Sequence, residues 1–233
     1  MSLISLAIYG SHARGDYVSN SDVDLFGLAT SMPSRLVTVG NIKLNIYDYS
    51  LFSEMAQNGS LYVWHLKEEG KIIFDFESKL KDIFFAFKLK KDYSIERIDA
   101  AQIGWLLFSP ETFCIHNKLR VDTIIYVLRT IVYSFLAERN IPAFSLREAI
   151  KHYKEEDVAR LWMLKSSNIV SNDDLVCFQG FLNRTTGVPP SWMGRQLEDI
   201  IDYFDKSSFA YRRCKELMAS NQYNLPPSMG TFS

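Results

Sequence analysis

The sequence predicts an α/β plus α protein, in which a small mixed β-sheet is followed by an all-helical domain. Up to about residue 91, short apolar stretches alternate with turn residues and short helical patterns. From residue 93 on, apolar residues instead recur with the 3.6-residue period of helices. The 233 residues are enough to bury a sizeable core. We therefore expect domains at residues 1–91 and 92–220, followed by a polar tail at residues 221–233.

The sheet half contains a recognisable order of turns and strands. Gly10-Ser11 ends the first strand, and Gly40-Asn41 has the chemistry of a two-residue hairpin turn. Asn58-Gly59 and Gly70 each end a helix. The expected elements are strands around residues 6–8, 22–29, 36–39 and 42–49, helices at 51–57 and 61–68, a strand at 71–76, and a basic amphipathic helix at 78–91.

The helical half is predicted from its apolar stripe and its caps. The stripe from Val121 to Leu136 follows helical spacing closely, and Ser145-Leu-Arg-Glu148 is a capping box that opens a helix. The expected helices span residues 94–108, 121–136, 149–153, 157–165, 172–185 and 191–205.

Composition and charge limit the kinds of partner. A hydrophobic fraction of 47% and a charged fraction of 23% are typical of globular proteins. The net charge of −1 gives no global support for nucleic-acid binding. Three cysteines (Cys114, Cys177 and Cys214) without Cys-x-x-Cys spacing indicate buried thiols in a reducing compartment. Because no run of about 18 apolar residues occurs, we expect a cytoplasmic protein without membrane contact.

The stretch from Gly10 to Asp24 has residues suited to phosphate and metal chemistry. Asp22 and Asp24, two residues apart on a strand, place their carboxylates on one face, about 7 Å apart. Charges this close repel each other unless a cation lies between them, and Mg²⁺ commonly takes one or two carboxylates plus substrate phosphates. Gly10 permits close backbone approach, and the following helix start favours an anion. This is the equipment for nucleotidyl transfer.

The spacing of these residues resembles a known motif. Gly10-Ser11, ten residues, then Asp22-Val-Asp24 is similar to the Gly-Ser-x10-Asp-x-Asp motif of the polymerase β-type nucleotidyltransferase superfamily. A longer stretch of sequence resembles the minimal and aminoglycoside nucleotidyltransferase branches of this superfamily. It comprises Gly10-Ser-His-Ala-Arg-Gly15 and Ser21-Asp-Val-Asp-Leu25. The resemblance covers about residues 5–75. The alternative is an ordinary β-turn followed by a solvated acidic strand.

The resemblance implies roles for individual residues. Gly10, Ser11, Arg14 and Ser21 would bind the nucleotide, and Asp22 and Asp24 would be catalytic metal ligands. The family has a third carboxylate on the next strand, and Asp48, between Tyr47 and Tyr49, matches its apolar-acid-apolar context. Asp48 could instead cap the helix at residues 51–57, in which case Asp16 and Asp75 are the fallback acids.

The expected function is a magnesium-dependent nucleotidyltransferase. It would transfer a nucleoside monophosphate, expected to be AMP, from a nucleoside triphosphate to a hydroxyl acceptor and release pyrophosphate, using two Mg²⁺ ions held by Asp22, Asp24 and Asp48. A small molecule or a protein hydroxyl is favoured over RNA as the acceptor. One alternative is a non-catalytic nucleotide-binding module or a toxin–antitoxin-type interaction module.

A further alternative is a fused ribonuclease. Arg147 and His152 have the Arg-x4-His spacing of HEPN ribonuclease domains, which often accompany minimal nucleotidyltransferases. A capped surface helix explains the same residues.

Overall fold

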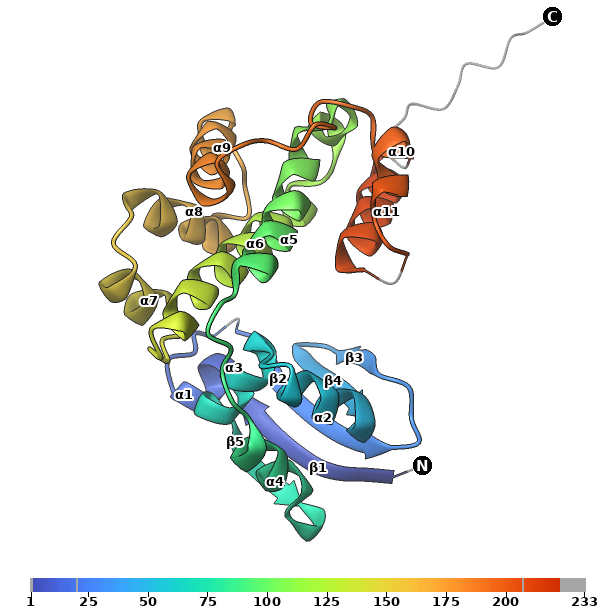
Figure 1. Ribbon diagram of the computed structural model, residues 1–233, viewed down its shortest axis with the longest axis vertical. Coiled ribbons are helices and arrows are strands. Elements are labelled where there is room, and N and C mark those ends of the chain that lie inside the picture. Colours follow the sequence, from blue (N-terminus) through green and yellow to red (C-terminus); the bar gives the residue numbers. More distant parts are fainter. Residues whose placement is uncertain (1, 20, 207, 223–233) are drawn as a thin grey trace, which may run out of the picture. The chain divides into compact units, whose positions relative to one another are not determined.

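The computed structural model describes residues 2–19, 21–206 and 208–222 (Figure 1). The chain divides into two compact units. The first contains the described residues up to Asp92 together with Leu136–Ala149. The second contains Tyr93–Phe135 and the described residues from Ile150 on.

The first unit is built on a five-stranded sheet with strand order β3-β4-β2-β1-β5. The strands are β1 (Ser2–Tyr9), β2 (Val23–Thr30), β3 (Arg35–Val39), β4 (Ile42–Asp48) and β5 (Lys71–Asp75). Strands β2 and β4 are parallel and the other neighbours are antiparallel, which confirms the predicted mixed sheet. Gly40-Asn41 makes the predicted β3–β4 hairpin turn, with Gly40 at a φ of +59° that glycine adopts without strain.

Short helices complete the first unit. They are α1 (Gly10–Arg14), α2 (Tyr49–Gln57), α3 (Leu61–Glu69), the 3-10 turn η1 (Phe76–Ser78) and α4 (Lys79–Ala86). The predicted basic helix at 78–91 is therefore too long. It ends at Ala86 because Phe87 becomes extended, with ψ of 135°, and its ring is buried.

Helices α2 and α3 lie against one face of the sheet (Figure 1), where an aromatic cluster holds them. The ring of Phe26 on β2 lies 4.5 Å from that of Phe52 on α2, and both residues are fully buried. Tyr47 on β4 lies 5.4 Å from Tyr62 on α3. Burial of each large apolar side chain contributes about 1.5–3 kcal/mol, so this face is the core of the unit.

A later segment of the chain also belongs to this unit. Phe144 packs on two neighbouring rings of α3, at 4.7 Å from Trp64 and 4.6 Å from His65. Trp64 is 2% exposed and Phe144 is 3% exposed. The outer side of α3 is thus covered by residues that follow it by about 80 positions in the sequence.

The described regular elements after residue 92 are all helical, as predicted. They are α5 (Ser94–Trp105), η2 (Leu106–Phe108), η3 (Pro110–Cys114), α6 (Asn117–Glu138), α7 (Leu146–His152), α8 (Glu156–Ser167), α9 (Asn172–Thr186), α10 (Leu197–Ile200), η4 (Ile201–Tyr203) and α11 (Phe209–Gln222). The predicted apolar stripe of α6 is buried at Val121, Ile124, Leu128, Ile131 and Val132.

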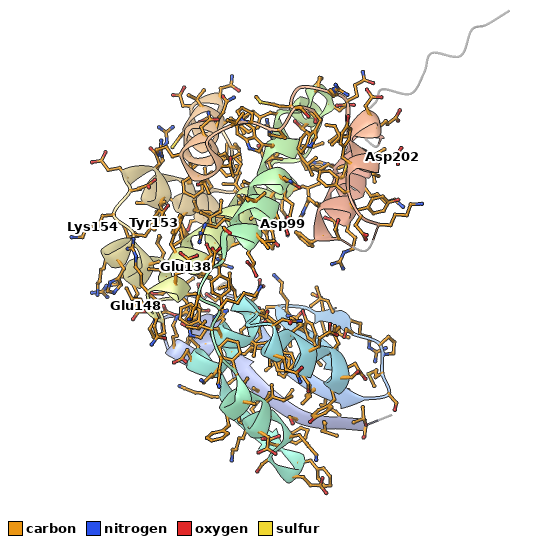
Figure 2. The ribbon with its side chains drawn as sticks, in the orientation of Figure 1. Asp99, Glu138, Glu148, Tyr153, Lys154 and Asp202 are labelled. Carbon is orange, nitrogen blue, oxygen red and sulfur yellow. The ribbon has the colours of Figure 1, made fainter. Side chains whose placement is uncertain are left out.

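Polar caps begin two of these helices. Ser145 Oγ accepts the Glu148 N–H at 3.2 Å, which is one half of the predicted capping box, and its hydroxyl donates to the carboxylate of Glu148 at 3.3 Å. Figure 2 labels Glu148. Ser171 and Asp174 form a complete capping box at α9.

The carboxyl-terminal part differs from the prediction. Residues 191–205 do not form one helix, because the chain turns at Gly194, with φ of +79°, before the short α10 and η4. Helix α11 was not predicted, although Ala210, Cys214 and Leu217 are buried at helical spacing. Of the predicted tail, residues 223–233 lie outside the described part of the chain.

The remaining observations concern the cysteine side chains and the apolar character of the helices. Cys214 is buried and Cys177 is half-buried, both as free thiols, while the side chain of Cys114 lies outside those described. Among the described residues, no helix has the length and apolar character needed to cross a membrane.

Candidate active site

One row of side chains crosses the sheet where β1 ends. The strand register pairs Tyr9 of β1 with Asp24 of β2, and Asp24 with Lys43 of β4. Residues in such a row point to the same side of the sheet. Phe26, two residues after Asp24, lies in the aromatic core, so the row faces the side that the helices cover.

Gly10 brings the first turn against Asp24. Gly10 begins α1 with φ of +71°, in the left-handed region. A Cβ added to it would lie 2.9 Å from Oδ2 of Asp24. The absence of a side chain therefore allows the backbone of the turn to contact the acidic residue, which brings together two of the predicted site residues.

Gly10→Ala is expected to damage the site as well as the fold. A non-glycine residue in the left-handed region costs about 1–2 kcal/mol, and here the methyl group also crowds Asp24. Gly15→Ala is a matched control, because Gly15 has φ of +85° and nothing lies within 4 Å of its added Cβ. We expect both variants to melt earlier, and only Gly10→Ala to lose stabilisation by Mg²⁺ plus a nucleoside triphosphate in thermal unfolding. Equal ligand responses would contradict the contact.

Asp22 already has a cationic partner. Oδ2 of Asp22, immediately before β2, accepts a hydrogen bond from Nζ of Lys43 at 2.5 Å, and each side chain is 43% exposed. An ion pair this exposed contributes only about 0–1 kcal/mol to stability. Its interest is its position, because Lys43 is also the register partner of Asp24.

Sequence reasoning missed Lys43. The prediction for β4 rests on its apolar face, which carries Ile42, Leu44 and Ile46. The alternate residues Lys43 and Asn45 share the side of Asp24. The signal was therefore the polar alternation of the same strand.

The structure does not bring Asp48 to the other two acids. Asp48 pairs with Ala29, five residues beyond the Asp24 row, which is about 16 Å along the strand. It is the N-cap of α2, where its carboxylate accepts the Ser50 N–H at 2.9 Å and also the Ser50 hydroxyl. Asp48 is therefore a helix cap, as the alternative prediction states. The prediction that Asp48 is the third metal ligand is corrected.

The fallback acids have other partners. Asp75 accepts the Ser5 hydroxyl at 2.6 Å and the backbone N–H groups of Leu80 and Lys81, so its carboxylate satisfies N–H groups in the first turn of α4. Asp16 pairs with Arg14 at 3.2 Å. Within the described chain, no group of three or more His, Cys, Asp or Glu residues could hold a metal ion. The acidic site consists of Asp22 and Asp24.

Substitutions of Asp48 distinguish its role as a helix cap from a role as a metal ligand. Asn caps helices about as well as Asp, whereas Ala does not. Asp48→Ala should therefore lower the melting temperature while Asp48→Asn changes it little, and both should respond normally to Mg²⁺ plus nucleotide. A metal-binding role would instead make Asp48→Asn lose that ligand response.

The pH dependence of the Asp48 cap has a definite sign. The Ser50 hydroxyl and then the Ser50 N–H lower the pKa of Asp48 below its usual 3.8. The charged cap therefore stabilises the fold above about pH 4 and is lost as the pH falls through the lowered value. The difference between the wild type and Asp48→Ala should shrink below that pH.

Arg14, at the end of α1, is held by two acids. Its Nη1 donates to Oε2 of Glu69 at 2.6 Å, and its Nε pairs with Asp16. Glu69, whose side chain is 9% exposed, also contacts Nε2 of His65 at 2.7 Å. Burial works to lower the pKa of Arg14, but the bonds to Asp16 and Glu69 outweigh it and raise that pKa. Arg14 is therefore a fixed positive charge.

The remaining predicted nucleotide ligands shape the turn and the loop after it. The carbonyl of Ser11 accepts the N–H groups of Gly15 and Asp16. The hydroxyl of Ser21 accepts the Val18 N–H at 2.9 Å, just before Asp22. Both residues thus lie on the connection from α1 to β2.

A buried phenol network underlies the acidic row. Tyr9 Oη accepts a hydrogen bond from Asn45 Nδ2 at 2.8 Å, and the Tyr62 hydroxyl donates to it at 3.4 Å. Burial raises the pKa of Tyr9, and it raises that of Tyr62 well above the usual 10, with Tyr9 adding to the effect. Both phenols stay neutral and support the row as hydrogen-bonding groups.

The Arg147 and His152 pair is not arranged as a site on α7. Both side chains are exposed. Five residues on an α-helix turn through about 140° beyond a full circle, so the two lie on different faces. Figure 2 shows Glu148 on the same helix, where it caps the first turn.

Comparison with known proteins finds similarity in the first part of the chain. Residues 2–100 match the family model described as the nucleotidyltransferase domain. A curated protein from Methanocaldococcus jannaschii, which carries the name of a protein adenylyltransferase, is 28% identical over 87 residues. The match covers 37% of this chain and 67% of that protein.

Proposed function

Because residues 2–100 form a nucleotidyltransferase domain, we propose that the protein transfers AMP from ATP to a hydroxyl group in a magnesium-dependent reaction that releases pyrophosphate. The observation that carries the proposal is the contact between Gly10 and Asp24. It joins a turn that a phosphate chain can approach to a pair of carboxylates that a metal ion can use.

The donor set fits a divalent ion held together with the nucleotide. Mg²⁺ is usually bound by one or two carboxylates plus substrate phosphates, and Asp22 and Asp24 are the two carboxylates present. A bound Mg²⁺ would neutralise phosphate charge and polarise the α-phosphate toward attack. Asp48 lies at the far end of β4, so Asp22 and Asp24 are the two carboxylates proposed for the site, and they support one ion better than two.

The protein's own residues would position the triphosphate. The backbone of Gly10-Ser11 approaches the phosphates, and the charge of Arg14, held by Glu69 and Asp16, favours them. The hydroxyl of the acceptor attacks the α-phosphorus, the bond from the α-phosphorus to the bridging oxygen breaks with its electrons going to pyrophosphate, and the hydroxyl proton is released to solvent.

A protein hydroxyl is the favoured acceptor. The M. jannaschii relative carries the name of a protein adenylyltransferase, and this supports both AMP as the transferred group and a protein as the acceptor. The net charge of −1 gives no counter-charge for an RNA acceptor.

The test is incubation with each of the four α-³²P nucleoside triphosphates and Mg²⁺. Protein mixtures, the enzyme itself and small hydroxyl compounds serve as acceptors. We expect pyrophosphate release and label transfer from ATP to a protein Ser, Thr or Tyr residue. Magnesium-dependent binding of ATP without product from any acceptor would favour the non-catalytic nucleotide-binding alternative.

A further inference from the structure

We propose that Lys43 is a resident cation of the acidic site and takes the place of a second divalent ion, so that the enzyme binds one divalent ion with its nucleotide. The inference rests on the proposed function, because it concerns the same site. It begins from the ion pair between Nζ of Lys43 and Oδ2 of Asp22 at 2.5 Å.

The backbone fixes Lys43 at this position. Lys43 lies on β4, a strand paired on both sides, and its register partner on β2 is Asp24. Its side chain therefore emerges beside Asp24 and reaches Asp22 two residues earlier. The ammonium group contacts one acid of the pair and neighbours the other.

The charges of the site show why one ion suffices. Two carboxylates held on one strand repel each other, and a cation between them relieves the repulsion. Lys43 supplies one positive charge without any metal. A divalent ion on Asp22 would have to displace the ammonium group or lie close to it, whereas Asp24, against the Gly10 turn, is where an ion would meet the phosphates.

Arg14, whose charge is proposed to favour the phosphates, is paired with acids other than Asp22. Arg14 is paired with Asp16 and with the poorly exposed Glu69. Lys43, by contrast, contacts Asp22 and is the register partner of Asp24.

The first experiment counts bound metal ions without any turnover. Mn²⁺ titration followed by electron paramagnetic resonance, with a non-hydrolysable ATP analogue, should give one ion per wild-type chain. Lys43→Glu replaces the ammonium with a third carboxylate in the Asp24 row and should give two. Lys71→Glu is the control, because Lys71 is an exposed lysine on β5, separated from β4 by two strands, and it should give one.

The second experiment measures stability without nucleotide. Lys43→Met should lower the melting temperature in metal-free buffer and increase the stabilisation by Mg²⁺ alone, since the acids have lost their counter-charge. Lys71→Met should change neither quantity.

The outcomes separate this inference from the proposed function. Two Mn²⁺ ions on the wild type, or one on Lys43→Glu, would overturn the role of Lys43 and leave nucleotidyl transfer standing. No Mn²⁺ on the wild type with nucleotide would overturn both.

Discussion

Asp24→Asn is expected to reduce nucleotidyl transfer by at least about 100-fold, a typical effect of removing one electrostatic group from an active site. The residue meets the Gly10 turn and lies in the Lys43 row, so in the proposed site its charge would hold a divalent ion beside the phosphates. Stabilisation by Mg²⁺ plus ATP analogue should shrink strongly, because ligand binding raises the melting temperature by linkage.

The same substitution should leave the metal-free fold intact. Removing one of two repelling carboxylates relieves repulsion. Circular dichroism and the metal-free melting temperature measure this, and Asp202→Asn, at an exposed position of the second unit, is the control for a neutralised aspartate (Figure 2). Normal AMP transfer by Asp24→Asn would show that Asp24 is not part of the active site.

Leu128→Asp is expected to unfold the protein or make it aggregate. Leu128 is completely buried in α6, at the centre of the apolar stripe. Burying an unpaired carboxylate costs several kcal/mol, against a total stability of about 5–15 kcal/mol. The soluble fraction and far-ultraviolet circular dichroism measure the effect.

The control for Leu128→Asp introduces the same charge at an exposed apolar residue. Met163, on α8, is 59% exposed, so Met163→Asp should leave the melting temperature nearly unchanged. If Leu128→Asp were soluble and melted like Met163→Asp, α6 would not be the core of the second unit.

Local rules predicted much of the fold. The Gly40-Asn41 hairpin follows from a turn whose backbone needs positive φ, and the stripe of α6 follows from a period that only a helix satisfies. The contact between Gly10 and Asp24 joins two segments whose spacing already indicated a shared site.

The sequence could not reveal the registers between strands. The roles of Lys43 and Asp48 depend on how β4 is aligned with β2, and a shift of one residue exchanges the faces of a strand. The pattern of β4 alone therefore favours the acid at the end of its apolar face over the lysine that lies beside Asp24. Likewise, residues 191–205 have helical composition, but Gly194 turns the chain.

The packing of Phe144 on Trp64 and His65 shows that the family match and the folded unit end at different places in the chain. The stretch that matches the nucleotidyltransferase family ends at residue 100, yet the first unit takes a piece of its core from Leu136–Ala149. A fragment cut at the end of the family match would leave the indole of Trp64 without its Phe144 cover. The part of the chain that matches the family model therefore lacks Leu136–Ala149, which contributes to the core of the first unit.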